Sequence, residues 1–222
     1  MRKLTWVLSL LVIVFCQVGF AASWEDNKDI SGGLSANGDS VIVADKNGNA
    51  AAIWQDSGSG KIVTSYRPVG GLWSPIESLG AGEPNPDISA DENGNLRAVW
   101  VQTGGVNIQT ATRSFGGSWS GASTITAGNT NADHVNVEIV SNSGYAAVVW
   151  TSLPGANNVV RAATWDGAAW TINNLNIPTD IIVDGASDPI VHVLPTGEVI
   201  AAYIGEDTGT NIRDVYYTNG NY

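Results

Sequence analysis

One segment recurs four times along the 222-residue chain. Three copies, VIVADKNGNAAAIW, DISADENGNLRAVW and VEIVSNSGYAAVVW, end at Trp54, Trp100 and Trp150, and a fourth, IVHVLPTGEVIAAY, ends at Tyr203. The aromatic ends are separated by 46, 50 and 53 residues, and glycines in the turns recur at the same intervals, at Gly48, Gly94, Gly144 and Gly197. Two independent markers therefore define one repeat, which indicates an array of similar supersecondary units.

The second half of each unit also repeats, as TSYRPVGGLWSP, TATRSFGGSWSG and RAATWDGAAWTI. Each unit predicts strand, Asn-Gly turn, strand, polar loop, strand, glycine-containing turn and strand. The Asn-Gly pairs at 47–48 and 93–94 favour primed hairpins, in which both central residues have positive φ. The strands that follow, such as residues 50–54, are nearly all apolar or small, which indicates burial on both faces. Four short antiparallel strands in about 40 to 50 residues correspond to one β-propeller blade.

We therefore expect an all-β fold, a propeller of four-stranded antiparallel blades with units at about 39–83, 84–131, 132–183 and 184–222. The last unit ends before its fourth strand. Residues 22–31 resemble that strand, because Trp24 followed by Ile30 matches Trp73 followed by Ile76 and Leu79. We expect residues 22–31 to pair with the strand at 211–217, completing the fourth blade and closing a four-bladed ring. The alternatives are a multimer that completes a larger ring and a fragment of a longer repeat protein.

The first residues have the order of a secretory signal peptide: Arg2 and Lys3, an apolar stretch at 4–18, then small residues at 19–23. The stretch is shorter than the roughly 20 residues of a spanning helix. Cleavage near Ala21 would remove Cys16, the single cysteine, so that packing rather than disulfides stabilises residues 22–222 as one propeller domain. We expect an exported protein that is periplasmic, displayed on the cell surface or secreted.

The chain is acidic, with 21 Asp and Glu against 10 Lys and Arg and a net charge of −11. Phosphate backbones would be repelled, so nucleic acid is not expected as a partner. The same charge disfavours a polybasic contact with an anionic membrane.

The D-x-N-G-N-x-x-A-V-W and G-G-x-W-S segments resemble the repeats of sialidase-like (BNR or Asp-box) bacterial propeller proteins. The resemblance covers nearly all of residues 22–222 and implies the fold. The Asp-box of that superfamily, S-x-D-x-G-x-T-W, is degenerate here, since only Asp166-Gly167 keeps an acidic residue beside the glycine. The resemblance would also imply a cluster of arginines, a Tyr/Glu nucleophile pair and an acid/base Asp. Four of the five arginines after residue 21 instead recur in or beside third strands, which indicates solvated blade surface, so we predict no catalytic residue; the five are Arg67, Arg97, Arg113, Arg161 and Arg213.

Ligands of propellers usually meet the face where the loops between second and third strands and the connections between blades converge. Many acidic residues fall there, and paired carboxylates could bind Ca²⁺ or divide acid and base roles in glycoside cleavage. The alternative is solvated loop charge. No spacing supplies a zinc site, and we predict no metal site and no cofactor, with Ca²⁺ as a weak alternative. The candidate ligand-binding residues are Asp133, His134, Trp165, Asp184, Asp188, Glu206 and Asp207.

Three further patterns leave alternatives open. DKNGN and DENGN lack the distant Glu of a calcium loop, and turn chemistry explains them. Glu138 aligns with Ile42, Ile88 and Val191, which would make it a buried carboxylate unless the strand is shifted by one residue. The repeated tryptophans are expected in the core, although TWDGAAW resembles a segment of fucose-binding propeller lectins, in which tryptophan stacks on sugar.

The sequence thus favours an exported, monomeric, non-enzymatic propeller that presents its loops to a protein or glycan ligand. The alternative is a carbohydrate-binding lectin or a glycan-active, degenerate sialidase-like enzyme. A convergent carboxylate pair would favour the enzyme, and exposed stacking tryptophans would favour the lectin.

Overall fold

The computed structural model describes residues 27–91, 93–105, 107–126, 132–139, 144–152, 159–174, 181–183, 189–194, 196–207 and 213–220. These residues form strands, turns and bends, without any helix that is long and apolar enough to cross a membrane. The expected signal segment, residues 1–21, lies outside them.

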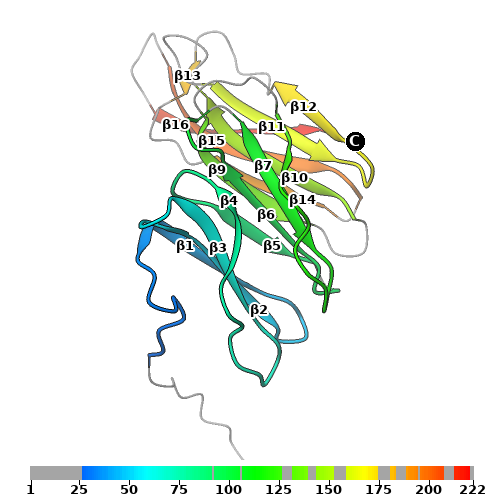
Figure 1. Cartoon of the computed structure of the whole chain (residues 1–222). Helices are drawn as coiled ribbons and strands as arrows, with labels where there is room; N and C mark the ends of the chain where they lie inside the picture. Colours follow the sequence, from blue (N-terminus) through cyan, green and yellow to red (C-terminus); the bar gives the residue numbers. More distant parts are fainter. Residues whose placement is uncertain are drawn as a thin grey trace, which may run out of the picture.

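The strands form four antiparallel sheets, which we number 1 to 4 in chain order (Figure 1). Sheet 1 contains β1 (Ala36–Ala44), β2 (Ala50–Asp56), β3 (Lys61–Arg67) and β4 (Glu77–Ala81). Sheet 2 contains β5 (Asp87–Ala90), β6 (Leu96–Val101), β7 (Ile108–Arg113) and β8 (Ser123–Thr124). Sheet 3 contains β9 (Ala132–Ile139), β10 (Ala146–Ser152), β11 (Val159–Trp165) and β12 (Trp170–Asn174). Sheet 4 contains β13 (Ile181–Val183), β14 (Ile190–Val193), β15 (Val199–Asp207) and β16 (Arg213–Gly220).

Sheets 1 to 3 are four-stranded meanders in chain order, which confirms the predicted order of strands in the repeat. Sheet 4 is different. β14 and β13 pair with successive parts of β15, and β16 pairs with the other edge of β15. Among the described residues, sheet 4 therefore lacks the outer strand that the other sheets have, and β16 pairs with β15 alone.

The strand register confirms the repeat and corrects one position. Each repeat aromatic has a partner in the third strand: Trp54 pairs with Val63, Trp100 with Gln109, Trp150 with Arg161 and Tyr203 with Tyr216. In sheet 3 the residue that pairs two positions before the aromatic is Val137, opposite Val148, whereas Glu138 pairs with Ala147. Of the two alternatives that the sequence left open for Glu138, the structure confirms the shift by one residue.

The hairpins that join first and second strands are not the primed turns we expected. Gly48 has φ of 85°, but Asn85 is the only non-glycine residue with positive φ among those described, so Asn47 is not left-handed. The N–H of Gly48 donates to the carbonyl of Asp45 (3.1 Å), and the N–H of Asp45 donates to the carbonyl of Asn49 (2.9 Å). These bonds define a type I turn followed by a left-handed glycine, the usual three-residue hairpin loop.

The sheets stack face to face in chain order. We call the side of a sheet that faces the next sheet its forward face and the opposite side its rear face. Ala51, Ile53 and Ile62 on the forward face of sheet 1 pack against Ile88, Ala98 and Trp100 on the rear face of sheet 2. The same contact recurs between sheets 2 and 3 and between sheets 3 and 4. Burial on both faces explains the apolar second strands: Trp54, Trp100 and Trp150 are 3%, 1% and 0% exposed.

The two ends of the stack do not meet within the described residues. None of the core clusters among the described residues joins sheet 4 to sheet 1, and sheet 1 lies at one end of the molecule (Figure 1). Of the segment 22–31, residues 27–31 are described, and Ile30 packs on the rear face of sheet 1, against Ala52, Trp54 and Val63, rather than beside β16. The expected closure of a four-bladed ring is therefore not confirmed by the described residues.

Candidate functional site

The loops divide between two ends of the sheets, as the sequence predicted. At one end, the turn end, the β1–β2 and β3–β4 turns touch, because the N–H of Val69 donates to Asn49 Oδ1 (2.9 Å). At the other, the loop end, the connection from sheet 1 to sheet 2 bonds to both neighbouring loops: Gly82 N–H to the Gly60 carbonyl (3.1 Å) and Gly104 N–H to Glu83 Oε1 (2.7 Å).

At the turn end, the D-x-N-G-N motif is a closed hydrogen-bond system. Asp45 Oδ1 accepts from the N–H groups of Asn47 (2.8 Å) and Asn49 (3.0 Å), and Asp45 Oδ2 accepts from Asn49 Nδ2 (2.6 Å). Burial raises the pKa of Asp45, but the bonds from Asn49, Asn47 and Gly48 outweigh it and hold that pKa below the ordinary 3.8. The carboxylate is therefore occupied by its own turn.

The same motif recurs in sheet 2, where Asp91 accepts from Asn93, from Asn95 N–H and from Asn95 Nδ2, at 2.8–2.9 Å. Asn95 Oδ1 then accepts from the N–H of Phe115 (3.0 Å), as Asn49 does from Val69. The turn role that the sequence predicted is thus confirmed for both motifs.

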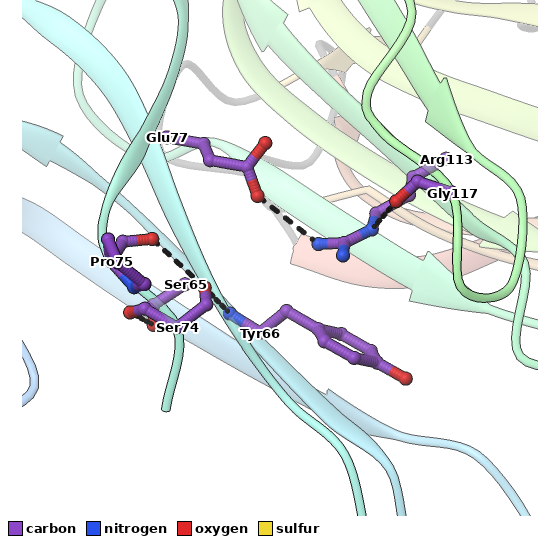
Figure 2. A network of polar contacts seen from close by, with 7 residues as sticks. All are labelled: Ser65, Tyr66, Ser74, Pro75, Glu77, Arg113 and Gly117. Carbon is purple, nitrogen blue, oxygen red and sulfur yellow. Dashed lines mark hydrogen bonds and ion pairs between the residues drawn. The ribbon is translucent and has the colours of Figure 1, made fainter. Parts of the chain in front are cut away.

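The repeated Trp-Ser pair also has a structural role. Ser74 Oγ accepts from the N–H of Tyr66 (3.1 Å) and donates to the carbonyl of Pro75 (2.9 Å), while Ser65 Oγ donates to the carbonyl of Ser74 (Figure 2). In sheet 2, Ser120 Oγ accepts from the N–H of Thr112 in the same way (3.0 Å). This serine holds the end of the third strand against the chain that leads to the fourth.

Arg113 joins sheet 2 to sheet 1. Its guanidinium lies 4.3 Å from the ring centroid of Tyr66, donates from Nε to the carbonyl of Gly117 (2.8 Å) and pairs with Glu77 Oε1 (3.4 Å) (Figure 2). Burial raises the pKa of Tyr66, and the charge of Arg113 opposes that shift. The arginine side chain is 12% exposed, so it is not solvated surface as the sequence had suggested.

Arg97 has the corresponding role between sheets 2 and 3. Its Cζ lies 5.0 Å from the ring centroid of Trp165 and 5.2 Å from that of Trp170, and the two rings are 5.6 Å apart at 53°. Arg97 is 7% exposed. A desolvated guanidinium on tryptophan contributes cation–π attraction of about 2 kcal/mol. Two of the arginines that a sialidase-like carboxylate site would need are therefore committed to contacts between sheets.

At the loop end, Asp56 and Glu83 accept hydrogen bonds from loops. Asp56, 5% exposed, accepts from the N–H of Gly58 (3.2 Å) and from both the N–H and the hydroxyl of Ser59. The hydroxyl of Ser59 is the main cause that lowers the pKa of Asp56, with burial opposing it. Glu83 holds Gly104 as described above. These carboxylates are occupied rather than paired with one another.

Amide side chains form an open polar surface at the described loop end of sheet 2. Gln102 Oε1 accepts from Asn107 Nδ2 (2.7 Å) and from Gln109 Nε2 (3.5 Å), and Gln109 Nε2 also donates to Thr124 Oγ1 (2.8 Å). Gln102 and Thr124 are exposed, while Asn107 and Gln109 are half-buried. We call these four residues the amide network. The sequence analysis missed them because it searched that face for charges, although they stand in the polar second-to-third-strand loop of unit 2 and its flanks.

The predicted ligand-binding residues fall into three groups. The backbone places Asp133 and His134 at the start of β9, and Glu206 and Asp207 at the end of β15, both at the loop end. Trp165 ends β11 opposite Ala146, at the turn end, half-buried between Arg97 and Trp170. It does not lie with the others. Asp184 and Asp188 lie outside the described residues. Across the described part of the chain, no three His, Cys, Asp or Glu side chains gather as metal ligands.

Solved structures share this arrangement of sheets, whereas no protein-family model and no curated protein matches the chain. A Hadza microbial sialidase is similar with a TM-score of 0.52 and 14% identity, over 82% of this chain and 44% of its own. An ulvan lyase gives a TM-score of 0.52 and 14% identity over 80% and 50%, and the Aleuria aurantia lectin, in complex with a fucosylated GlcNAc, a TM-score of 0.52 and 12% over 82% and 63%. The chain thus shares the fold of these proteins and spans 44% to 63% of their length.

Proposed function

We propose that the chain is a non-enzymatic binding module that takes a glycan at the loop end, with the amide network as part of the contact surface. The amide network is the observation that carries the proposal. Side-chain amides offer donors and acceptors at once, which suits the many hydroxyl groups of a sugar. The network holds these groups in place before a ligand arrives, so less ordering opposes binding.

The charged groups support binding rather than catalysis. Glycosidases of both stereochemical classes need two carboxyl groups about 5 to 9.5 Å apart across the scissile bond. Asp56 and Glu83, on the described part of the loop end, are instead tied to loop amides. Arg97 and Arg113 contact aromatic rings between sheets and are therefore not available to bind a carboxylate of a ligand.

The similar proteins fit this proposal only through their fold. Their printed names include a sialidase, a lyase of ulvan and a lectin bound to a fucosylated sugar. One fold supports both binding and catalysis, so the choice for this chain depends on its own side chains. Export through residues 1–21 would place the module where glycans are displayed.

Binding to a glycan array, using protein without residues 1–21, tests the proposal. We expect saturable binding that the double variant Gln102→Ala/Asn107→Ala lowers at least about tenfold, the effect of roughly 1.4 kcal/mol. Asn47→Ser is the matched control, because it removes an exposed amide from the turn end. Equal binding by wild type and the double variant, or release of a product from any bound glycan, would contradict the proposal.

A further inference from the structure

In the part of the chain that the structure describes, the stack leaves one face without a neighbouring sheet at each end: the forward face of sheet 4 and the rear face of sheet 1. Within the stack, every forward face meets the rear face of the following sheet. The two free faces are therefore one forward face and one rear face, the same pair that packs together at each contact between described sheets.

The free forward face of sheet 4 is apolar and exposed. Directly paired residues of antiparallel strands point to the same face, so Ile190, Ala202 and Tyr217 share it, as do Ile204 and Val215. Val215 has the register position of Ile62, Ile108 and Val160, each opposite the residue that follows the repeat aromatic. Those three are at most 1% exposed, but Val215 is 77% exposed, as is Tyr217. The surface that the next sheet would bury is present and uncovered.

The free rear face of sheet 1 has the matching features. Ile42 is 63% exposed, whereas its register equivalent Ile88, covered by sheet 1, is 2% exposed. Trp100 Nε1 donates to the carbonyl of Ala81 in the preceding sheet (3.3 Å). Trp54 has the same position in sheet 1, which no described sheet precedes, and its buried Nε1 has no hydrogen-bond partner. Trp150 Nε1 in sheet 3 also has no hydrogen-bond partner.

A pocket of about 400 Å³ opens on this rear face between Ile42, Ala52 and Trp54, walled by residues 28–31. Residues 28–31, which form this wall, match part of the repeat. Ile30 follows Trp24 by six residues, as Leu79 of β4 follows Trp73. Ile30 packs on the rear face of sheet 1, much as Leu79 of β4 packs against sheet 2. Residues 27–31 therefore resemble the end of an outer strand, the element that sheet 4 lacks.

We propose that a second copy of this chain covers these faces, with the forward face of sheet 4 of one copy packed on the rear face of sheet 1 of the other. The internal contacts between sheets are the template for this joint, so no new kind of interface is needed. Residues 22–31 of one copy would lie beside the partner's β16 and complete sheet 4, which removes an open sheet edge.

Head-to-tail contacts of this kind either close into a ring or grow into filaments. Two copies hold twice the four sheets of one chain, which corresponds to propellers of about eight blades, the upper end of the usual range. The expected product is therefore a closed dimer. Each copy carries a net charge of −11, so added salt should strengthen the association by screening repulsion.

Sedimentation velocity of the full chain, produced with its own N-terminal residues, tests the proposal across the micromolar range. We expect the wild type to sediment as a dimer. Val215→Lys/Tyr217→Lys, on the forward face of sheet 4, and Ile42→Lys, on the rear face of sheet 1, should each sediment as a monomer with unchanged thermal unfolding of the monomer. Leu72→Lys, at a site 87% exposed in the β3–β4 turn, is the matched control and should remain dimeric.

Mixing the two variants tests the head-to-tail arrangement directly. The first variant keeps an intact rear face and the second an intact forward face, so an equimolar mixture should recover a dimer through one joint. A symmetric contact between identical faces would instead leave one of the variants dimeric on its own. A monomeric wild type, a dimeric Val215→Lys/Tyr217→Lys variant or the absence of recovery on mixing would each overturn the proposal.

Discussion

Asn49 links two turns of sheet 1, so replacing this one side chain should lower the free energy of unfolding. Asn49→Ala deletes the bond from Nδ2 to the Asp45 carboxylate (2.6 Å) and the bond from Val69 N–H to Oδ1 (2.9 Å). Bonds to charged groups contribute about 1.5 to 3 kcal/mol and neutral ones about 0.5 to 1.5. Val69 is exposed and Asp45 half-buried, so water replaces part of the loss. We expect a decrease of about 2 kcal/mol in the free energy of unfolding.

Urea unfolding at neutral pH measures this change. For a domain of this size, about 2 kcal/mol corresponds to a decrease in Tm of roughly 4 to 8 °C. Asn47→Ala is the control, because Asn47 is exposed in the same turn and uses only its backbone N–H there. A surface change of that kind should remain within about 0.5 kcal/mol of wild type.

A substitution to aspartate separates the two bonds. Asn49→Asp keeps an acceptor for Val69 but replaces the amide donor by a second carboxylate beside Asp45, so it should destabilise more than Asn49→Ala at neutral pH and less in acid. If Asn49→Ala unfolds within about 0.5 kcal/mol of wild type, the bridge between the two turns does not stabilise the fold, and the argument from the hydrogen bonds is refuted.

Three further predictions concern the sheet contacts and the loop end. A Cβ on Gly82 would lie 2.5 Å from Trp100 Cδ1, so Gly82→Ala should destabilise by about 1 to 3 kcal/mol in urea unfolding, while Gly121→Ala, with open space around it, should not. A double-mutant cycle of Arg97→Ala and Trp165→Ala should give a coupling energy of about 1 to 2 kcal/mol, and additive effects would contradict the cation–π contact. The fold lowers the pKa of Asp56, so its ionised carboxylate contributes fully to the free energy of unfolding above about pH 3.8. That contribution is lost as pH falls through the pKa of the folded state. Asp56→Asn should therefore make the free energy of unfolding depend less on pH in acid.

The turn end could be predicted from the sequence in most respects. The side chains and backbone of D-x-N-G-N lie within five residues, so Asp45 and Asn49 find each other through local geometry alone. The type of turn was predicted wrongly, because the Asn-Gly pair favours a primed hairpin. The carboxylate of Asp45 instead accepts from Asn47 and supports a type I turn.

The arginines and Trp165 could not be predicted because their partners come from another sheet. Arg97 and Trp165 are separated by more than one repeat, and only the packing of sheet 2 on sheet 3 brings them together. A residue type that recurs at one strand position has the same backbone environment in each unit. This recurrence does not show whether a neighbouring sheet covers that side chain.

By itself, the sequence determined the repeat, the strand order of sheets 1 to 3, the burial of Trp54, Trp100 and Trp150, and the division into a turn end and a loop end. These follow from alternation, spacing and turn residues, which act within one unit. Only the tertiary structure decided the one-residue register of Glu138, the burial of Arg97 and Arg113, and the free faces at the two ends of the stack. Each of these depends on how one sheet packs on the next, and the repeated segments are too alike to reveal where the packing stops.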